Sequence, residues 1–263
     1  MLVGDTMIEK LFKELSLLEQ VEAIALGGSR SGSNFDTNSD YDVYLYVTSP
    51  VDENIRKELL NKYCDYVEIG NHFWELEDNC TLKNGVDIDI LYRNLDDFTL
   101  DVASVVEDCN ARTGYTTCMW HNLLTCKIIY DKCGRLQNTK DRFSVSYPEK
   151  LRKNIIEKNM NLLSGMLPSY DFQIQKAVKR KDLISMNHRV SAFMESYFDV
   201  IFALNRLTHP GEKRLVDLCL KNCSILPVDF EKNIAKLFDD LFENPDCVSD
   251  DICDIVSRLK EVV

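Results

Sequence analysis

The sequence predicts an α+β protein, in which an N-terminal domain with a mixed β-sheet and flanking helices precedes a domain made only of helices. In the first half, short apolar and β-branched runs such as Val21–Leu26 and Tyr41–Val47 alternate with stretches of helical periodicity. After Pro148 the helical spacing continues and no convincing strand recurs. We therefore expect residues 1–147 to form the first domain and residues 148–263 a helical bundle.

Composition limits the class of protein. Of 263 residues, 45% are hydrophobic and 28% charged, which is typical of a globular protein. The formal net charge of −12 argues against nucleic acid as the main partner, because nucleic-acid binding depends on lysine and arginine. No stretch is long and apolar enough to span a membrane, and the start lacks a secretory signal pattern, so we expect a cytoplasmic protein.

The first domain is expected to contain the following elements. Residues 5–19, 51–63, 95–109 and 113–130 have helical spacing, and residues 21–26, 41–47 and 86–92 have the composition of strands. Residues 65–78 are ambiguous, with one short strand at Tyr66–Ile69 as an option. The polar residues 137–146 are interpreted as the boundary between the domains.

The second domain is expected to contain only helices. Their predicted ranges are 151–167, 172–180, 183–207, 212–222, 228–242 and 249–261. Gly211, Pro227 and Pro245 separate the later ones.

The most informative stretch, residues 27–42, lies between the first two predicted strands. It begins Gly27-Gly28-Ser29 and ends Asp40-Tyr41-Asp42. Asp40 and Asp42 are two residues apart, so on an extended chain their carboxylates leave the same face. Two anions held so close favour a cation between them, and Mg²⁺ prefers a few carboxylates together with phosphate oxygens. A glycine-serine turn can cradle phosphate with its backbone N–H groups.

Gly28-Ser29 followed by Asp40-x-Asp42 resembles the signature of the DNA polymerase β-like nucleotidyltransferase superfamily. Within it the chain looks closest to small bacterial two-domain enzymes related to aminoglycoside and lincosamide nucleotidyltransferases. The resemblance implies ATP as the donor, two Mg²⁺ ions and a helical domain that forms the other wall of the cleft. The alternative is an ordinary hairpin whose acids are solvated.

The resemblance also implies a third carboxylate on a later strand. Residues 86–92 carry two candidates, Asp87 and Asp89, which interrupt an otherwise apolar strand on one face. We favour Asp89, since a strand end and a helix start follow it, and keep Asp87 as the alternative. A second alternative is that Asp87 and Asp89 have no catalytic role and are two solvated acids on an edge strand.

The candidate phosphate-binding residues are small or basic. Gly28 and Ser29 suit a turn that approaches the substrate closely, and Ser39 is included with them. Arg30 could contact phosphate or pair with Asp36. Lys213 could reach the triphosphate from the second domain, or simply follow the end of a helix.

The function expected from these residues is nucleotidyl transfer, with Asp40, Asp42 and Asp89 as catalytic residues and Asp40, Asp42, Asp89 and Asp87 as metal ligands. AMP from ATP would be transferred to a hydroxyl of a small acceptor, for example an aminoglycoside-like antibiotic, with release of pyrophosphate. The alternatives are transfer to tRNA or protein, as in toxin and antitoxin relatives, or a non-catalytic nucleotide-binding module. A homodimer is left open.

Overall fold

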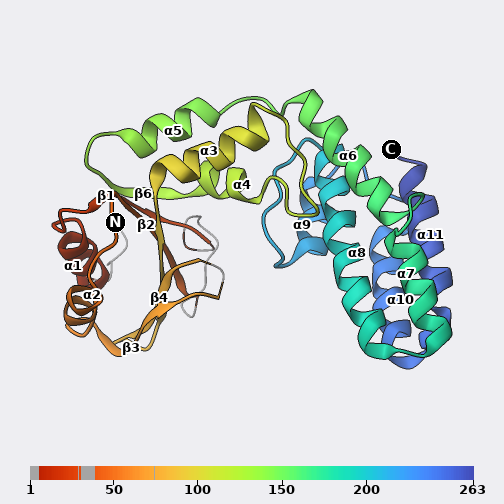
Figure 1. Ribbon diagram of the computed structural model, residues 1–263, viewed down its shortest axis with the longest axis horizontal. Helices are drawn as coiled ribbons and strands as arrows, with labels where there is room; N and C mark the ends of the chain where they lie inside the picture. Colours follow the sequence, from red (N-terminus) through yellow and green to blue (C-terminus); the bar gives the residue numbers. More distant parts are fainter. Residues whose placement is uncertain (1–5, 29, 31–38, 74) are drawn as a thin grey trace. The chain divides into compact units, whose positions relative to one another are not determined.

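The computed structural model of the chain describes residues 6–28, 30, 39–73 and 75–263 (Figure 1). The chain folds into two compact units, one made of residues 1–103 and 122–145 and the other of residues 104–121 and 146–263. The sheet belongs to the first unit and the second is built from helices and loops, which confirms the predicted α+β class. The domain boundary expected after residue 147 stays a prediction.

The first unit contains a mixed sheet with the strand order β3-β4-β5-β2-β1-β6. Strands β2 and β5 are parallel, whereas the other neighbours are antiparallel. The bounds of the strands are β1 Val21–Leu26, β2 Tyr41–Val47, β3 Cys64–Asn71, β4 Glu77–Leu82, β5 Asp87–Arg93 and β6 Lys127–Asp131. The central strands β1, β2 and β5 lie where the sequence predicts strands.

One face of this sheet is apolar and packs against α1 (Thr6–Leu15) and α2 (Glu53–Leu60). Alternate residues of β2 and β5, among them Val43, Leu45 and Ile90, are fully buried in this core. Since side chains alternate across a strand, Asp42 and Asp89 lie on the opposite face. The face opposite the core is therefore mixed, since it carries Asp42 and Asp89 beside the buried rings of Tyr44 and Tyr46.

A buried ion pair joins α2 to the β3–β4 hairpin. Arg56 donates from Nη1 to Oδ1 of Asp78 at 2.5 Å, and both side chains are almost fully buried. Tyr92 donates its hydroxyl to Oδ2 of Asp78 at 2.8 Å, and the backbone N–H of Gly70 donates to Oδ1 at 2.9 Å. A buried carboxylate requires such partners, so Asp78 fixes the hairpin against α2.

Three further helices follow the first five strands, namely α3 Leu95–Val106, α4 Cys118–Thr125 and α5 Arg135–Phe143. Asn94 caps α3, since its Oδ1 accepts the backbone N–H groups of Asp96 and Asp97 at 2.9 and 3.1 Å. The ring of Phe98 packs edge-on against Tyr46 at a centroid distance of 5.6 Å. This contact places the start of α3 over the face of β2 that carries Asp42.

The second unit contains α6 Glu149–Leu163, α7 Tyr170–Arg180, α8 Leu183–Leu204, α9 Leu215–Asn222, α10 Phe230–Glu243, a short 3₁₀ helix Pro245–Cys247 and α11 Val248–Lys260. The second half of α8 is buried almost throughout, so it forms the centre of the unit. Its Asp199 accepts the backbone N–H and the hydroxyl of Thr116 at 3.0 and 2.6 Å and the amide of Asn159 at 3.0 Å. These bonds attach the loop before α4 to the helical core.

The sequence-based prediction was wrong in one segment. Residues 113–130 form α4 and the edge strand β6 rather than one helix, because Ile128 and Tyr130 pair with β1. Residues 137–143 belong to α5, whose Leu136, Thr139 and Phe143 are buried at helical spacing, and the two compact units divide after residue 145. The hairpin of β3 and β4 resolves the ambiguity of residues 65–78.

No helix in the described part of the chain combines the length and the hydropathy that a membrane crossing requires.

The buried histidine of the second unit makes stability depend on pH. His209 is fully buried, and its Nδ1 accepts the backbone N–H of Gly211 at 3.2 Å. Burial, and after it the neighbouring His121, lowers the pKa of His209 to about 3. The unfolded chain binds this proton near pH 6.5, whereas the folded chain does so only near pH 3, so stability falls as the pH drops between these values.

We predict that wild-type protein loses about 3 kcal/mol more unfolding free energy between pH 7 and pH 4 than the His209→Gln variant does. Urea unfolding at a series of pH values measures this difference. His188→Gln, at an exposed histidine, serves as the control and should keep the wild-type pH dependence. Equal pH dependence of His209→Gln and wild type would contradict the assignment.

Candidate active site

Asp42 and Asp89 are direct neighbours on the face of the sheet opposite the α1–α2 core. Asp42 is the second residue of β2, Asp89 is the third of β5, and the two are partners in the register of this parallel pair. Neighbouring strands are about 4.8 Å apart, so the two half-buried carboxylates leave the sheet side by side. Like charges directly opposite each other destabilise a sheet. The pair therefore favours a bound cation.

The end of β1 lies directly against Asp42. The backbone N–H of Gly27 donates to the carbonyl of Asp42 at 2.8 Å, which continues the ladder beyond β1. Gly28 has a φ of +57°, and a Cβ at this residue would overlap Oδ2 of Asp42. Both the backbone conformation and the close approach thus require glycine. The backbone of this turn and the carboxylate of Asp42 consequently form one surface.

The other predicted carboxylates lie at the edge of this surface. Asp40 is exposed and precedes β2 by one residue. Asp87 is exposed at the start of β5, where its Oδ1 accepts the hydroxyl of Thr81 at 2.7 Å. Asp89, by contrast, is half-buried and in register with Asp42. The geometry therefore favours Asp89 over Asp87 as the partner of Asp42.

The predicted phosphate-binding residues are only partly brought together. Arg30 donates from Nε to the carbonyl oxygen of Ser39 at 2.5 Å, and its guanidinium lies 3.9 Å from the ring centroid of Tyr41. These contacts hold Arg30 and Ser39 together at the start of β2. Ser29 and Asp36 lie outside the described residues. Lys213 is exposed in the second unit, shortly before α9.

The sequence analysis missed the residues of β4 that support Asp89. Asn79 donates from Nδ2 to Oδ1 of Asp89 at 2.7 Å, and its own Oδ1 accepts the amide of Asn71 at 2.6 Å. Asn71 also donates to Oε2 of Glu68 at 2.9 Å. This chain of amides fixes the orientation of the Asp89 carboxylate.

A further carboxylate, Glu77, shares this face of β4. Its side chain is buried, and burial followed by the charge of Asp89 raises its pKa. The signal in the sequence is the alternation of Glu77, Asn79 and Thr81, which the polar Asp78 between them obscures. Negative charge is therefore concentrated on this part of the sheet.

The donors at the site suit a hard cation. Carboxylate and amide oxygens are the ligands of Mg²⁺, which binds through one or two carboxylates and completes its shell with substrate phosphates and water. Within residues 6–28, 30, 39–73 and 75–263, no group of three or more His, Cys, Asp or Glu side chains is arranged to hold a metal ion. The pair of Asp42 and Asp89 fits a metal that shares its coordination with a bound nucleotide.

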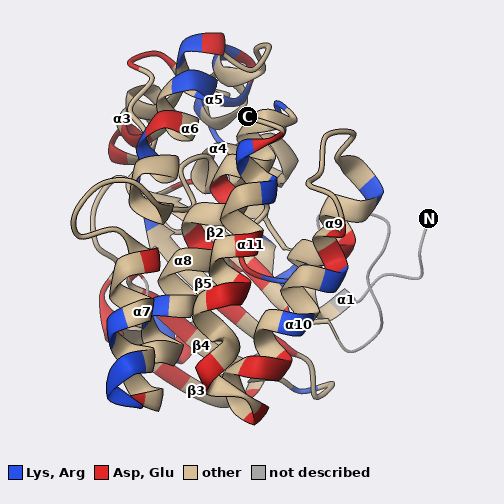
Figure 2. Cartoon of the chain, turned by 90° about the vertical axis from the view of Figure 1, so that its right-hand side faces the viewer, with Lys and Arg blue, Asp and Glu red and all other residues tan. Residues whose placement is uncertain are grey.

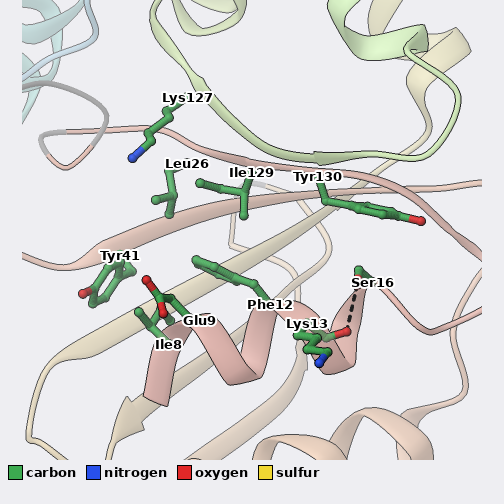
Figure 3. A pocket seen from close by; sticks show the side chains of 10 residues that line it. All are labelled: Ile8, Glu9, Phe12, Lys13, Ser16, Leu26, Tyr41, Lys127, Ile129 and Tyr130. Carbon is green, nitrogen blue, oxygen red and sulfur yellow. Dashed lines mark hydrogen bonds between the residues drawn. The ribbon is translucent and has the colours of Figure 1, made fainter. Parts of the chain in front are cut away.

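The opposite face of the sheet carries a cavity of about 480 Å³ between α1 and the edge strand β6 (Figure 3). Phe12 and Ile129 face each other across it, and Glu9 is one of the polar residues of its lining. Its mainly apolar and aromatic lining differs from the acidic surface around Asp42. Tyr41 lines the cavity and precedes Asp42 in β2, so the cavity and the candidate site use opposite faces of the same strand.

The helices of the second unit carry charges of both signs. In Figure 2, basic and acidic segments alternate along α7, α10 and α11. Lys236 of α10, for example, pairs with Asp240 at 2.7 Å and also contacts Asp251 of α11. The visible side of these helices is a mixed surface rather than a basic one.

Comparisons with known proteins find only distant likenesses. Residues 115–214, less than half of the chain, match a family described as a domain of unknown function, DUF4037. No curated protein sequence matches the chain.

Three solved structures are distantly similar to the chain over most of its length. A nucleotidyltransferase-like protein from Exiguobacterium sibiricum 255-15 has a TM-score of 0.43 and 9% identity, covering 97% of this chain and 74% of that one. An aminoglycoside 6-adenyltransferase from Bacillus subtilis has a TM-score of 0.30 and 7% identity, covering 97% and 89%. A CCA-adding enzyme in complex with ATP has a TM-score of 0.28 and 12% identity, covering 98% and 81%. At these TM-scores and identities, none of the three likenesses carries an argument about function.

The contact between Gly28 and Asp42 can be tested by substitution. We predict that Gly28→Ala lowers the unfolding free energy by more than Gly85→Ala does. Both residues have positive φ, which alone costs about 1 kcal/mol in alanine, but a Cβ at Gly85 would have no neighbour within 4 Å. Urea unfolding measures both changes.

In an Asp42→Ala background the extra cost of Gly28→Ala should disappear, because the Cβ of residue 42 lies 3.5 Å away and leaves room. If Gly28→Ala and Gly85→Ala lower the unfolding free energy equally while Asp42 is present, Gly28 is not packed against the carboxylate of Asp42.

Proposed function

We propose that the chain is a nucleotidyltransferase that transfers a nucleoside monophosphate, AMP from ATP, to a hydroxyl group of a small acceptor and releases pyrophosphate. The observation that carries this proposal is the pair of Asp42 and Asp89 on adjacent parallel strands, with the Gly28 backbone pressed against one of them. Paired carboxylates beside a glycine turn suit a polyphosphate whose charge is shared with divalent cations.

Each residue has a distinct role in this proposal. Asp42 and Asp89, with Asp40 at the edge, would hold Mg²⁺ against the triphosphate, and the turn at Gly28 and Ser29 would grip the distal phosphates. Asn79 would keep the Asp89 carboxylate in a fixed orientation through its hydrogen bond of 2.7 Å. Arg30 and Ser39, which lie together at the start of β2, would face the phosphates from the loop side. When bound, Mg²⁺ would neutralise the charge that develops on the phosphate oxygens.

The reaction is an in-line displacement. The acceptor's hydroxyl oxygen forms a bond to the α-phosphorus, and the bond from this phosphorus to the oxygen that bridges the α- and β-phosphates breaks. The electron pair of that bond leaves with pyrophosphate, and the proton of the hydroxyl passes to the carboxylate of Asp89. Positioning of the two reactants and neutralisation of charge supply most of the acceleration in such reactions.

The acidity of the chain supports a small and cationic acceptor. The formal net charge of −12 attracts cations and repels a second polyanion such as tRNA. An aminoglycoside-like molecule combines positive charge with several hydroxyl groups and therefore fits this requirement.

Pyrophosphate release from ATP tests the proposal. In the presence of Mg²⁺ and a panel of aminoglycosides, lincosamides, tRNA and proteins, we expect release with at least one small cationic acceptor. Asp42→Asn and Asp89→Asn should each lower kcat/KM about 10³-fold or more, because each removes a ligand at the reacting phosphates. Asp65→Asn, at an exposed carboxylate of β3, is the matched control and should keep wild-type activity.

Other outcomes identify the alternatives. A loss in Asp87→Asn with normal turnover in Asp89→Asn would make Asp87 the third carboxylate. Release with tRNA or protein alone would replace the small acceptor. Tight ATP binding without release for any acceptor would mean a nucleotide-binding module, and near-normal turnover in Asp42→Asn would end the assignment.

A further inference from the structure

A second side chain of β2 supports the glycine turn beside Asp42. A Cβ at Gly27 would overlap Cε2, Cζ and Oη of Tyr44, just as a Cβ at Gly28 would overlap Asp42. Residues 42 and 44 leave the same face of the strand. The backbone at Gly27 and Gly28 therefore rests on two consecutive side chains of this face, one acidic and one aromatic.

Tyr44 is itself held from two directions. Its hydroxyl donates to Oδ1 of Asn122 in α4 at 2.7 Å. One face of its ring is covered by the guanidinium of Arg93, whose Cζ lies 4.0 Å from the ring centroid. Cation–π contact of this kind fixes the plane of the ring. The hydrogen bond to Asn122 thus fixes the hydroxyl end of the side chain, and the contact with Arg93 fixes the plane of its ring.

Arg93 is in turn held in place by Glu75. Its Nε and Nη2 donate to the two carboxylate oxygens of Glu75 at 2.7 and 2.6 Å, and its side chain is almost fully buried. Planar two-point pairing of this kind restricts the guanidinium to one orientation. Tyr44, which contacts Gly27, is therefore connected to α4 through Asn122 and to the loop before β4 through Arg93 and Glu75.

We propose that Tyr44 is a positioning residue for the nucleotide's phosphates. The ring of Tyr44 limits how closely the Gly27–Gly28 backbone can approach β2. It thereby determines the distance between the backbone N–H groups that would bind phosphate and the carboxylates of Asp42 and Asp89. Tyr44 acts through the backbone and does not touch the substrate. The inference rests on the proposed function, since it assigns the support of that same phosphate site.

The tether to Asn122 allows this role to be tested without removing the ring. Tyr44→Phe keeps the ring against Gly27 and under Arg93 but loses the hydrogen bond, and Asn122→Ala loses the same bond from the other end. Each variant should weaken binding of Mg²⁺-tripolyphosphate and of Mg²⁺-ATP about 2- to 10-fold, which is the range for one hydrogen bond. The double variant should be no weaker than either single one, because both changes remove one interaction.

Displacement of a fluorescent ATP analogue measures these dissociation constants, and thermal unfolding of each variant is recorded beside them. Tyr63→Phe is the matched control, since it also removes one tyrosine hydroxyl bond in the first unit, to Glu14 on α1. It should leave both dissociation constants unchanged.

The outcomes separate this inference from the function on which it rests. Wild-type affinity in Tyr44→Phe, with or without a lower melting temperature, would overturn the positioning role and leave the proposed function standing. Wild-type protein that binds neither Mg²⁺-ATP nor Mg²⁺-tripolyphosphate would overturn both. A parallel loss in Tyr44→Phe and Asn122→Ala, absent from Tyr63→Phe, would support the inference.

Discussion

The parallel pairing of β2 with β5 is the constraint on which the candidate site depends. It brings Asp42 and Asp89, which are far apart in the sequence, into register on one face of the sheet. The opposite side chains of the same two strands, including Val43 and Ile90, are fully buried against α1 and α2. A slip of one residue in either strand would turn its carboxylate into the core and its apolar residues outward. The hydrophobic core therefore fixes the register that keeps the acidic pair together.

The surroundings of the pair restrict it further. The Gly28 backbone occupies the space beside Asp42, and the amide of Asn79 holds one oxygen of Asp89. Two carboxylates held side by side repel each other, so this arrangement costs stability unless a cation is bound. Sites that bind charged ligands commonly retain such conflicts, which binding of the ligand relieves. The fold thus holds Asp42 next to Asp89 at a cost in stability, and the proposed binding of Mg²⁺ would remove that cost.

The central strands could be predicted because their composition and their neighbours agree. Val21–Leu26 and Tyr41–Val47 are short apolar runs between turn residues, and the structure forms strands over these same ranges. The hairpin of β3 and β4 could not be predicted, because the burial of Asp78 depends on partners on other elements, Arg56 of α2 and Tyr92 of β5. In the site, the motif indicated Asp42, and the strand end and helix start that follow Asp89 favoured it over Asp87. The register of β5 with β2 favours the same residue. The supporting roles of Asn79 and Tyr44 depend on contacts between strands and helices that have no local signal.

Binding of a divalent metal shows whether Asp42 and Asp89 form one site. Electron paramagnetic resonance of Mn²⁺, a substitute for Mg²⁺, can follow binding to the protein in the presence of a non-hydrolysable ATP analogue. We expect nucleotide-dependent Mn²⁺ binding to wild type and to Asp65→Asn, and its loss in both Asp42→Asn and Asp89→Asn. Wild-type Mn²⁺ affinity in either of the last two variants would contradict this expectation.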